Sequence, residues 1–397
     1  SAVARQAQSE RLTEAVLEFV RGIAVIKSCN LVGEQSDLLR NSFRDSRDKA
    51  IAFEKNILPW MMGLGTLYGI GTAGVFAAGL WAYMDDGLSL LYLLGMLLLV
   101  LEIFGPLKAL FAESSNLAIM DSCLDRIDAL FAEPELCDGA RTTFPDDWQG
   151  PVVEYRHVGF SYGEGEVLHD VSFAMQPKTM TALVGSSGSG KSTVANLLPR
   201  FWDVSDGAVL VGGVDVRELS FTTLMDQVSM VFQNVYLFND TIANNIAMAK
   251  PDATEEEIVR AAKKARCYDF IMALPEGFQT MVGEGGANLS GGEKQRISIA
   301  RSILKDAPIV ILDEATASVD SDNERHIQEA IDALVRGKVL LVIAHRLRTI
   351  ERADQILVLD DGHIVERGTH QQLLAQNGLY ANLYRKTTGQ TGGKEEK

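Results

Sequence analysis

The residues with the clearest capacity for chemistry form a short run, Gly185 to Ser192, with the sequence GSSGSGKS. The run follows the apolar segment Thr181–Val184 and precedes a helical pattern. Glycines allow successive backbone N–H groups to turn around phosphate oxygens, and the helix that follows adds its positive N-terminal end. The sequence therefore predicts a nucleotide-binding loop in which Lys191 reaches the β- and γ-phosphates and the Ser192 hydroxyl binds Mg²⁺.

Two carboxylates follow a second apolar segment, Ile309–Leu312. A buried strand that ends in Asp313 and Glu314 is unfavourable unless the carboxylates meet a cation or a reacting group. Asp313 suits the shell of Mg²⁺, and Glu314 suits a general base that polarises an attacking water. The alternative is an ordinary strand end with its acids in solvent, and the nearby phosphate loop makes this alternative less favoured.

A third feature is the segment Leu289–Glu293, which precedes a helical run over 294–304. Its small residues Ser290, Gly291 and Gly292 would open a second helix end able to bind an anion. One phosphate chain does not easily occupy two such ends in one domain. We therefore expect the second end to serve a nucleotide held by another copy of the chain.

A sheet must hold these residues in place. Apolar segments at 181–184, 228–232, 309–312 and 339–343 alternate with helical segments, which predicts a parallel sheet covered on both faces. We assign 151–388 to this α/β domain and 133–150, with its helix-breaking Pro and Gly residues, to a linker. Residues 389–397 are expected to be an unordered tail.

The N-terminal part, 1–132, is unlike the rest. No charged residue or histidine lies between Lys55 and Asp85, and Glu102 alone interrupts 87–107. The first stretch is more than long enough for a helix to cross the ~30 Å hydrocarbon core. We predict two membrane spans, at about 57–83 and 87–107, joined by a tight turn. A buried hairpin of a soluble protein is less favoured, because soluble helices rarely stay apolar on every face.

Basic residues flank the two predicted spans, whereas the turn between them has none. Those before the first span are Arg40, Arg44, Arg47, Lys49 and Lys55, and those after the second are Lys108 and Arg126. The positive-inside rule then places both outer ends in the cytoplasm. Glycines within the first span would permit close packing against other helices.

Two interpretations of Glu102 stay open. An ionisable residue inside a span marks a transport pathway by default. Alternatively, Glu102 faces a water-filled cavity near other helices or lies nearer the membrane interface. Upstream, apolar residues at three- and four-residue steps predict an amphipathic helix over about 12–26, and a second charged helix leads from about Ser36 into the first span.

The overall composition excludes some classes of protein. The formal charge is −16, which argues against a protein that mainly binds nucleic acid. The four cysteines are scattered without CxxC spacing, so neither a zinc site nor a disulfide framework is predicted. A reducing, cytoplasmic setting fits most of the chain.

In their order along the chain, these motifs resemble those of an ATP-binding cassette (ABC) transporter of the exporter-fold, half-transporter kind. Gly185–Ser192 is similar to the Walker A loop and Ile309–Asp313 to Walker B. Leu289–Glu293 is similar to the LSGGQ signature, with Glu in place of Gln. The segment Ala317–Asp320 is similar to the D-loop, and Ser28–Gly33 to the second coupling helix.

The resemblance implies a role for each site residue. Glu314, His345 and Gln233 are implied as catalytic, through similarity to the catalytic glutamate, the switch histidine and the Q-loop glutamine. Those implied to bind Mg²⁺ are Ser192, Gln233 and Asp313. Those implied to bind ATP are Tyr162, which is similar to the aromatic residue that stacks on adenine, and Gly185, Ser186, Ser187, Gly188, Ser189, Gly190, Lys191, Ser192, Thr193, Ser290, Gly291, Gly292 and Asp320.

The family fold is an α-helical membrane domain fused to an α/β P-loop ABC ATPase domain. The implied assembly is a head-to-tail dimer of two half-transporters, a homodimer or a heterodimer, in the cell membrane, with ATP and Mg²⁺ bound and the nucleotide-binding domain in the cytoplasm. ATP hydrolysis would drive export of a lipid, peptide or drug-like cargo. Alternatives are an exporter-fold importer of iron–siderophore complexes, a non-transport ABC ATPase and an ATP-gated membrane protein.

The chain departs from the family pattern in two places. Gly285 follows Gly283-Glu284, where many members have Arg or Lys, which leaves a salt bridge from this loop in doubt. The family has six spans per half, whereas this chain carries two predicted spans. We therefore expect it to be the C-terminal portion of a half-transporter.

Overall fold

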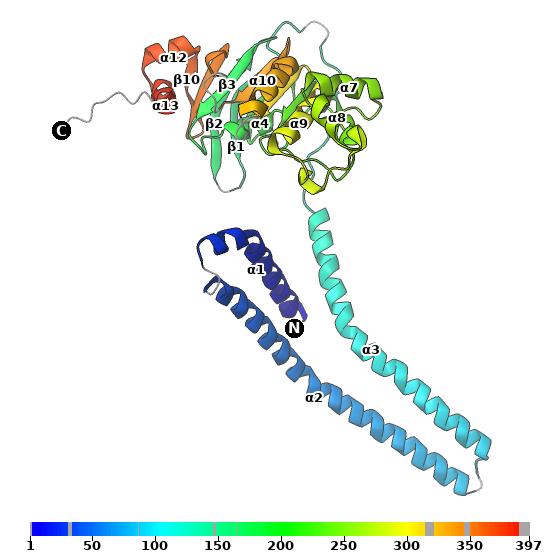
Figure 1. Cartoon of the computed structure of the whole chain (residues 1–397). Coiled ribbons are helices and arrows are strands. Elements are labelled where there is room, and N and C mark those ends of the chain that lie inside the picture. Colours follow the sequence, from blue (N-terminus) through cyan, green and yellow to red (C-terminus); the bar gives the residue numbers. More distant parts are fainter. Residues whose placement is uncertain are drawn as a thin grey trace, which may run out of the picture. The chain divides into compact units, whose positions relative to one another are not determined.

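The computed structural model describes residues 2–30, 34–85, 87–145, 148–163, 165–313, 321–344 and 350–388. The chain divides into two compact units, Ser1–Glu135 and Leu136–Lys397. The boundary falls inside the predicted linker, and the second unit takes most of that linker. The predicted fold class, a helical domain fused to an α/β domain, is confirmed (Figure 1).

The first unit consists of three long helices. These are α1 (Ala2–Ser28), α2 (Glu34–Met84) and α3 (Leu90–Phe131), and α2 contacts both of the others. The predicted amphipathic helix lies within α1, and the predicted charged helix and the first predicted span form the single helix α2. The Ser89 side chain caps α3, where it accepts a hydrogen bond from the backbone N–H of Tyr92.

One helix among the described residues is long and apolar enough to cross a membrane. Its candidate region is Leu39–Met84, and none of its most apolar window is buried within the chain. At the second predicted span, α3 contributes a shorter apolar segment, Leu90–Val100. Large side chains such as Trp60 and Trp81 are 78% and 72% exposed, as expected of surfaces that face lipid.

Gly79 fulfils the expectation that glycine permits close packing. A Cβ at this position would collide with Met96 Cε and approach Leu93 Cδ1 to 3.1 Å, so α2 and α3 meet closely there. At four other glycines of α2 an added Cβ would meet none of the described atoms within 4 Å; these are Gly63, Gly65, Gly69 and Gly74.

The second unit is built on a six-stranded sheet with the order β10-β9-β3-β8-β7-β6. The strands are β3 (Met180–Gly185), β6 (Val228–Val231), β7 (Ile309–Asp313), β8 (Val339–Ile343), β9 (Gln355–Asp360) and β10 (His363–Gly368). The first five are parallel and β10 is antiparallel to β9. All four predicted strands are confirmed.

Both faces of this sheet are buried, as the continuous apolar segments predict. Along β7, Val310 and Leu312 belong to one buried cluster, whereas Ile309 and Ile311 belong to another. Successive side chains of a strand point to opposite faces, so an unbroken apolar run is what a sheet covered on both sides requires.

A second, antiparallel sheet was not predicted. Its order is β2-β1-β4-β5, from β1 (Val153–Ser161), β2 (Glu166–Met175), β4 (Asp206–Val211) and β5 (Val214–Asp215). Its register shifts around His157 and Asp170, whose backbones both have positive φ and whose side chains share a hydrogen bond of 2.6 Å. Such β-bulges interrupt the alternation of apolar and polar residues that marks a strand in sequence.

Several helices of the second unit cover the parallel sheet, whereas α7 and α8 pack on other helices (Figure 1). The helices of this unit are α4 (Lys191–Leu197), α5 (Phe221–Gln227), α6 (Ile242–Ala247), α7 (Glu255–Lys264), α8 (Tyr268–Ala273), α9 (Gly291–Lys305), α10 (Ser321–Val335), α12 (His370–Gln376) and α13 (Leu379–Thr388). Of these, α4 and α9 begin at the Walker A and signature motifs.

The linker that follows Glu135 is attached to the second unit. The Arg141 N–H donates to the Glu218 carbonyl at 2.9 Å, and the Ser220 N–H donates to the Arg141 carbonyl at 2.9 Å. Farther along, the indole Nε1 of Trp148 donates to the Pro151 carbonyl at 2.8 Å. These bonds hold residues of the predicted linker against the second unit.

Candidate nucleotide-binding site

The parallel sheet brings some of the predicted site residues to one edge. Leu183 of β3 is opposite Ile343 of β8, which in turn is opposite Asp313 of β7. The loop that begins at Gly185 and the carboxylate of Asp313 therefore emerge on the same side, two strands apart. Gln233 follows β6, the next strand along. In open α/β sheets the carboxyl edge is where ligands bind.

The glycines of the loop have conformations or neighbours that exclude a side chain. Gly188 and Gly190 have φ of +81° and +96°, which only glycine adopts readily. A Cβ on Gly190 would come within 2.6 Å of Leu168 Cδ2, and one on Gly185 would collide with the Leu359 carbonyl oxygen. The turn is therefore held close to β2 and β9 by backbone geometry.

Lys191 is folded back into the loop. Its Nζ donates to the carbonyl oxygens of Gly185 at 3.1 Å and Ser186 at 2.6 Å, and to Ser189 Oγ at 3.4 Å. The residue is only 7% exposed and Ser189 only 2%. A buried ammonium held by neutral oxygens is well placed to meet the charge of a phosphate.

The donor set at this edge fits Mg²⁺. Mg²⁺ prefers hard oxygen ligands and shares them with substrate phosphates. The Ser192 side chain lies exposed on the first turn of α4, the carboxylate of Asp313 is half-buried at the end of β7, and Gln233 is exposed. These side chains would supply a hydroxyl, a carboxylate and an amide oxygen.

Two buried side chains anchor α4 behind the loop. The Tyr155 hydroxyl donates to the Val194 carbonyl at 2.7 Å, and burial raises the pKa of this phenol well above its ordinary value, so that it stays a donor. At the other end of α4, Arg200 is 4% exposed and its guanidinium is bonded twice to Asp203, at 2.6 and 3.1 Å. A bidentate pair of this kind fixes both partners.

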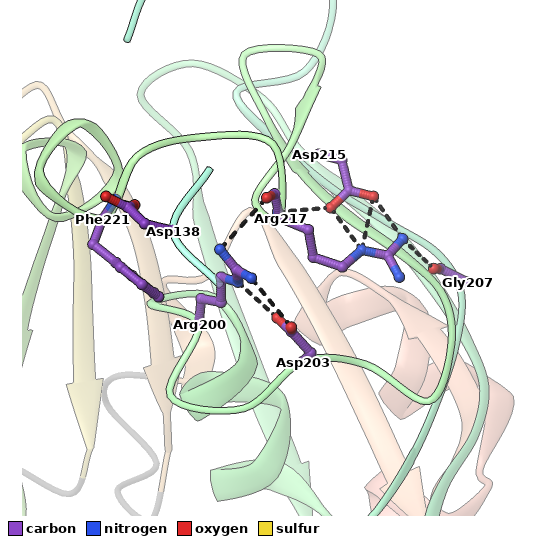
Figure 2. Close-up of polar contacts among 7 residues, drawn as sticks. All are labelled: Asp138, Arg200, Asp203, Gly207, Asp215, Arg217 and Phe221. Atoms are coloured by element: carbon purple, nitrogen blue, oxygen red, sulfur yellow. Dashed lines mark hydrogen bonds and ion pairs between the residues drawn. The ribbon is translucent and has the colours of Figure 1, made fainter. Parts of the chain in front are cut away.

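Figure 2 shows how this anchor continues. Arg200 Nη1 also reaches the Arg217 carbonyl at 3.5 Å, and Arg217 is in turn paired with Asp215 at 2.6 Å. The guanidinium of Arg200 lies 5.0 Å from the ring centroid of Phe221, whose N–H donates to Asp138 of the linker. These residues were not predicted, because their contacts join segments that are far apart in the sequence.

Tyr162, which the resemblance implies as a residue that binds adenine, lies beside the phosphate loop. Its hydroxyl contacts Thr193 Oγ1 at 3.4 Å, and Thr193 belongs to the first turn of α4. The residue is 52% exposed. The fold therefore brings together Tyr162, Lys191 and Ser192 from segments about thirty residues apart.

The signature residues lie on a different helix. Ser290 is the N-cap of α9, which packs against α6, α7, α10 and β6. The Ser290 hydroxyl accepts a bond from the Glu293 N–H at 3.4 Å, while the Glu293 carboxylate accepts bonds from the Ser290 N–H and hydroxyl, both at 2.8 Å. This reciprocal capping box could have been found from the S-x-x-E spacing, a signal that the sequence analysis did not use.

Several predicted residues fall outside the described part of the chain. They are Glu314, Asp320 with the rest of the D-loop, His345, and residues 31–33 of the segment similar to a coupling helix.

The chain is similar in sequence to known proteins. A family profile described as ABC transporter matches residues 168–317, which include both Walker motifs and the signature. The ATP-dependent lipid A-core flippase of Legionella pneumophila is 38% identical over 390 residues, which cover 94% of this chain and 63% of the flippase. The flippase of Pseudomonas aeruginosa is 54% identical over 235 residues, 58% of this chain and 39% of the relative.

A solved structure extends the likeness to the whole fold. The structure of a bacterial Atm1-family ABC exporter with ATP bound has a TM-score of 0.82 and 30% sequence identity, covering 100% of this chain and 70% of that one. The chain spans less than two thirds of the length of the flippases that it matches.

Proposed function

The chain belongs to the ABC transporter family, and on this premise we propose that it is the ATP-binding and membrane-spanning part of an ATP-driven lipid exporter. The observation that carries the proposal is the phosphate loop, with its buried Lys191 at the same sheet edge as Asp313. The names of the relatives, ATP-dependent lipid A-core flippases, favour a lipid as cargo and favour export over import.

In this proposal different residues of the chain bind ATP and promote its hydrolysis. Lys191 leaves its loop carbonyls to bind the β- and γ-phosphates, and the loop N–H groups surround the remaining oxygens. Tyr162 stacks on the adenine. Glu314 accepts the proton of the attacking water, while Gln233 and His345 position that water and the γ-phosphate.

Ser192, Asp313 and Gln233 would hold Mg²⁺, which neutralises phosphate charge when bound. All three offer oxygen atoms at the carboxyl edge of the sheet.

The second half of the site comes from another copy or a related half-transporter. Ser290, Gly291 and Gly292 begin α9, whose N–H groups suit a phosphate, yet they belong to a helix separate from the phosphate loop. A head-to-tail dimer would place this helix end, together with Asp320, against the nucleotide of the partner.

For the membrane part we propose two spans, at about 57–83 and 87–107, in the cell membrane with the nucleotide-binding domain in the cytoplasm. The apolar, unburied surface of α2 supports the first span, and the apolar start of α3 supports the second. We also propose domain limits of 1–132 and 151–388.

The test measures phosphate release and ATP-dependent thermal stabilisation of the full chain in lipid nanodiscs. The substitution Glu314→Gln should abolish turnover while ATP still raises the melting temperature, because the proton acceptor is lost and the binding loop is intact. A conservative change away from the site, Glu276→Gln, serves as the control. Unchanged phosphate release in Glu314→Gln would refute the assigned role.

Dimer formation and cargo need separate measurements. With the native cysteines replaced, the pair Ser187→Cys and Asn288→Cys should form an intermolecular disulfide that depends on ATP, since both residues are exposed in the single chain.

Lipid A should stimulate ATPase activity more than an apolar peptide does. Stimulation by the peptide alone would contradict a lipid cargo.

A further inference from the structure

A row of aromatic side chains begins at the position proposed to bind adenine. Tyr162 meets Phe160 at a ring-centroid distance of 4.6 Å and Trp202 at 5.1 Å, in both cases with ring planes at 89°. Trp202 also meets Phe160 at 6.5 Å. Two neighbouring rings, one from the end of β1 and one from the segment after α4, therefore restrict the orientation of the Tyr162 ring.

This support matters because Tyr162 is half exposed. An exposed phenol ring rotates freely about its side-chain bonds, and that freedom is lost when a base stacks on it. Phe160 is 2% exposed and forms part of the core, whereas Trp202 is 42% exposed. Trp202 is therefore partly buried, and it makes with Tyr162 an edge-to-face contact of the kind that stabilises aromatic pairs.

The backbone around Trp202 is unusually well fixed. Arg200 has a φ of +56° and its guanidinium is bonded twice to Asp203. This single ion pair joins residues on either side of Trp202 and closes the turn that carries it. The Arg200 end of this turn is buried, with only 3% of its side chain exposed. The indole is thus presented to Tyr162 by a rigid segment.

We propose that Trp202 is a positioning residue that holds the Tyr162 ring ready to stack on the base of the bound nucleotide. The inference rests on the proposed function, in which Tyr162 binds adenine. Trp202 acts on the base and not on the phosphates, because its ring contacts are with Tyr162, Phe160 and Phe201.

The experiment compares two ligands that differ in the base. Affinities of the full chain in nanodiscs are measured for the non-hydrolysable ATP analogue AMP-PNP and for inorganic tripolyphosphate, both with Mg²⁺. Trp202→Ala should weaken AMP-PNP binding about threefold to tenfold. Its affinity for tripolyphosphate should stay within about twofold of the wild-type value, since that ligand has no base to stack.

Two further variants separate positioning from structure. Trp202→Phe keeps an edge-to-face ring and should restore most of the AMP-PNP affinity. Phe238→Ala is the matched control: Phe238 is 49% exposed and forms a similar edge pair, at 5.2 Å, with Tyr236 and not with Tyr162. This control should bind both ligands as the wild type does.

The outcomes are distinct. Equal AMP-PNP affinity in wild type and Trp202→Ala would overturn the positioning role while leaving the proposed function intact. Parallel loss of both ligands would show that Trp202 supports the fold of the site and would also overturn it. A wild-type chain that binds neither ligand would refute the proposed function, and this inference with it.

Discussion

Helices α4 and α9 both begin at a predicted phosphate-binding end, but the two ends have different N-caps. The N-cap of α4 is Gly190, which has a φ of +96° and no side chain with which to cap the helix. The N-cap of α9 is Ser290, which forms a capping box with Glu293. The first four N–H groups of a helix have no partner within it, so each end must find one elsewhere.

The difference between the two N-caps indicates how each helix end would meet a nucleotide. At α4 no side chain caps the helix end, and the buried ammonium of Lys191 adds a positive charge beside it, which suits an anionic ligand. At α9 the Glu293 carboxylate already satisfies the Ser290 N–H at 2.8 Å, so the helix end is stable in a single chain. We therefore expect the phosphate loop to provide the primary affinity for the nucleotide, and the signature end to act on a nucleotide that another chain has bound.

Substitution of a lysine at each helix end should give the largest difference in ATP affinity between the two ends. Lys191→Met should weaken ATP binding by about 30- to 100-fold, because a charge-assisted bond to the phosphates is lost from a buried site. Lys294→Met, on the first turn of α9, removes only a 3.3 Å bond to the Gly285 carbonyl and should change affinity by less than about twofold. Titration of the full chain with a fluorescent ATP analogue measures both. Similar losses in the two variants would remove the distinction between the two ends.

Glycine replacements test the backbone of each end. Gly190→Ala should destabilise the nucleotide-binding unit by about 1–3 kcal/mol, because the positive φ and the contact with Leu168 both oppose a side chain. At Gly291 an added Cβ would meet none of the described atoms within 4 Å, so Gly291→Ala should change stability by less than about 0.5 kcal/mol.

Thermal unfolding of the two glycine variants without nucleotide gives the comparison. Gly291→Ala should nevertheless reduce ATPase activity, since its new methyl group would face the partner's nucleotide. A lower melting temperature for Gly291→Ala than for Gly190→Ala would reverse the expected order.

Removal of the capping box at α9 should have a smaller effect, which is on the stability of the chain. Glu293→Ala loses the two bonds to Ser290 and should lower stability by about 0.5–2 kcal/mol, whereas Glu293→Gln should retain most of it because glutamine also completes a capping box. Urea unfolding of the nucleotide-free chain, followed by a probe on α9, measures the change. Equal stability of all three proteins would mean that the cap contributes nothing measurable.

Motifs with fixed spacing were predictable because their geometry is local. A strand followed by GSSGSGKS and a helix can close around a phosphate with few other parts of the chain, and β3, the loop and α4 lie where the sequence predicts. The four apolar strand segments were equally clear, since burial on both faces leaves an unbroken apolar run. The bulged strands β1 and β2 lack that regularity and were missed.

What the sequence determined by itself was the set of parts: a phosphate loop, a strand ending in Asp313, a signature helix and an apolar helix able to cross a membrane. Only the tertiary structure decided their arrangement. The strand order places Asp313 two strands from the phosphate loop, and the paired turn of Arg200 and Asp203 carries Trp202 to Tyr162. The reason is physical: local spacing fixes hydrogen bonds within a few residues, whereas contacts between distant segments follow from how the two sheets and their helices share one core.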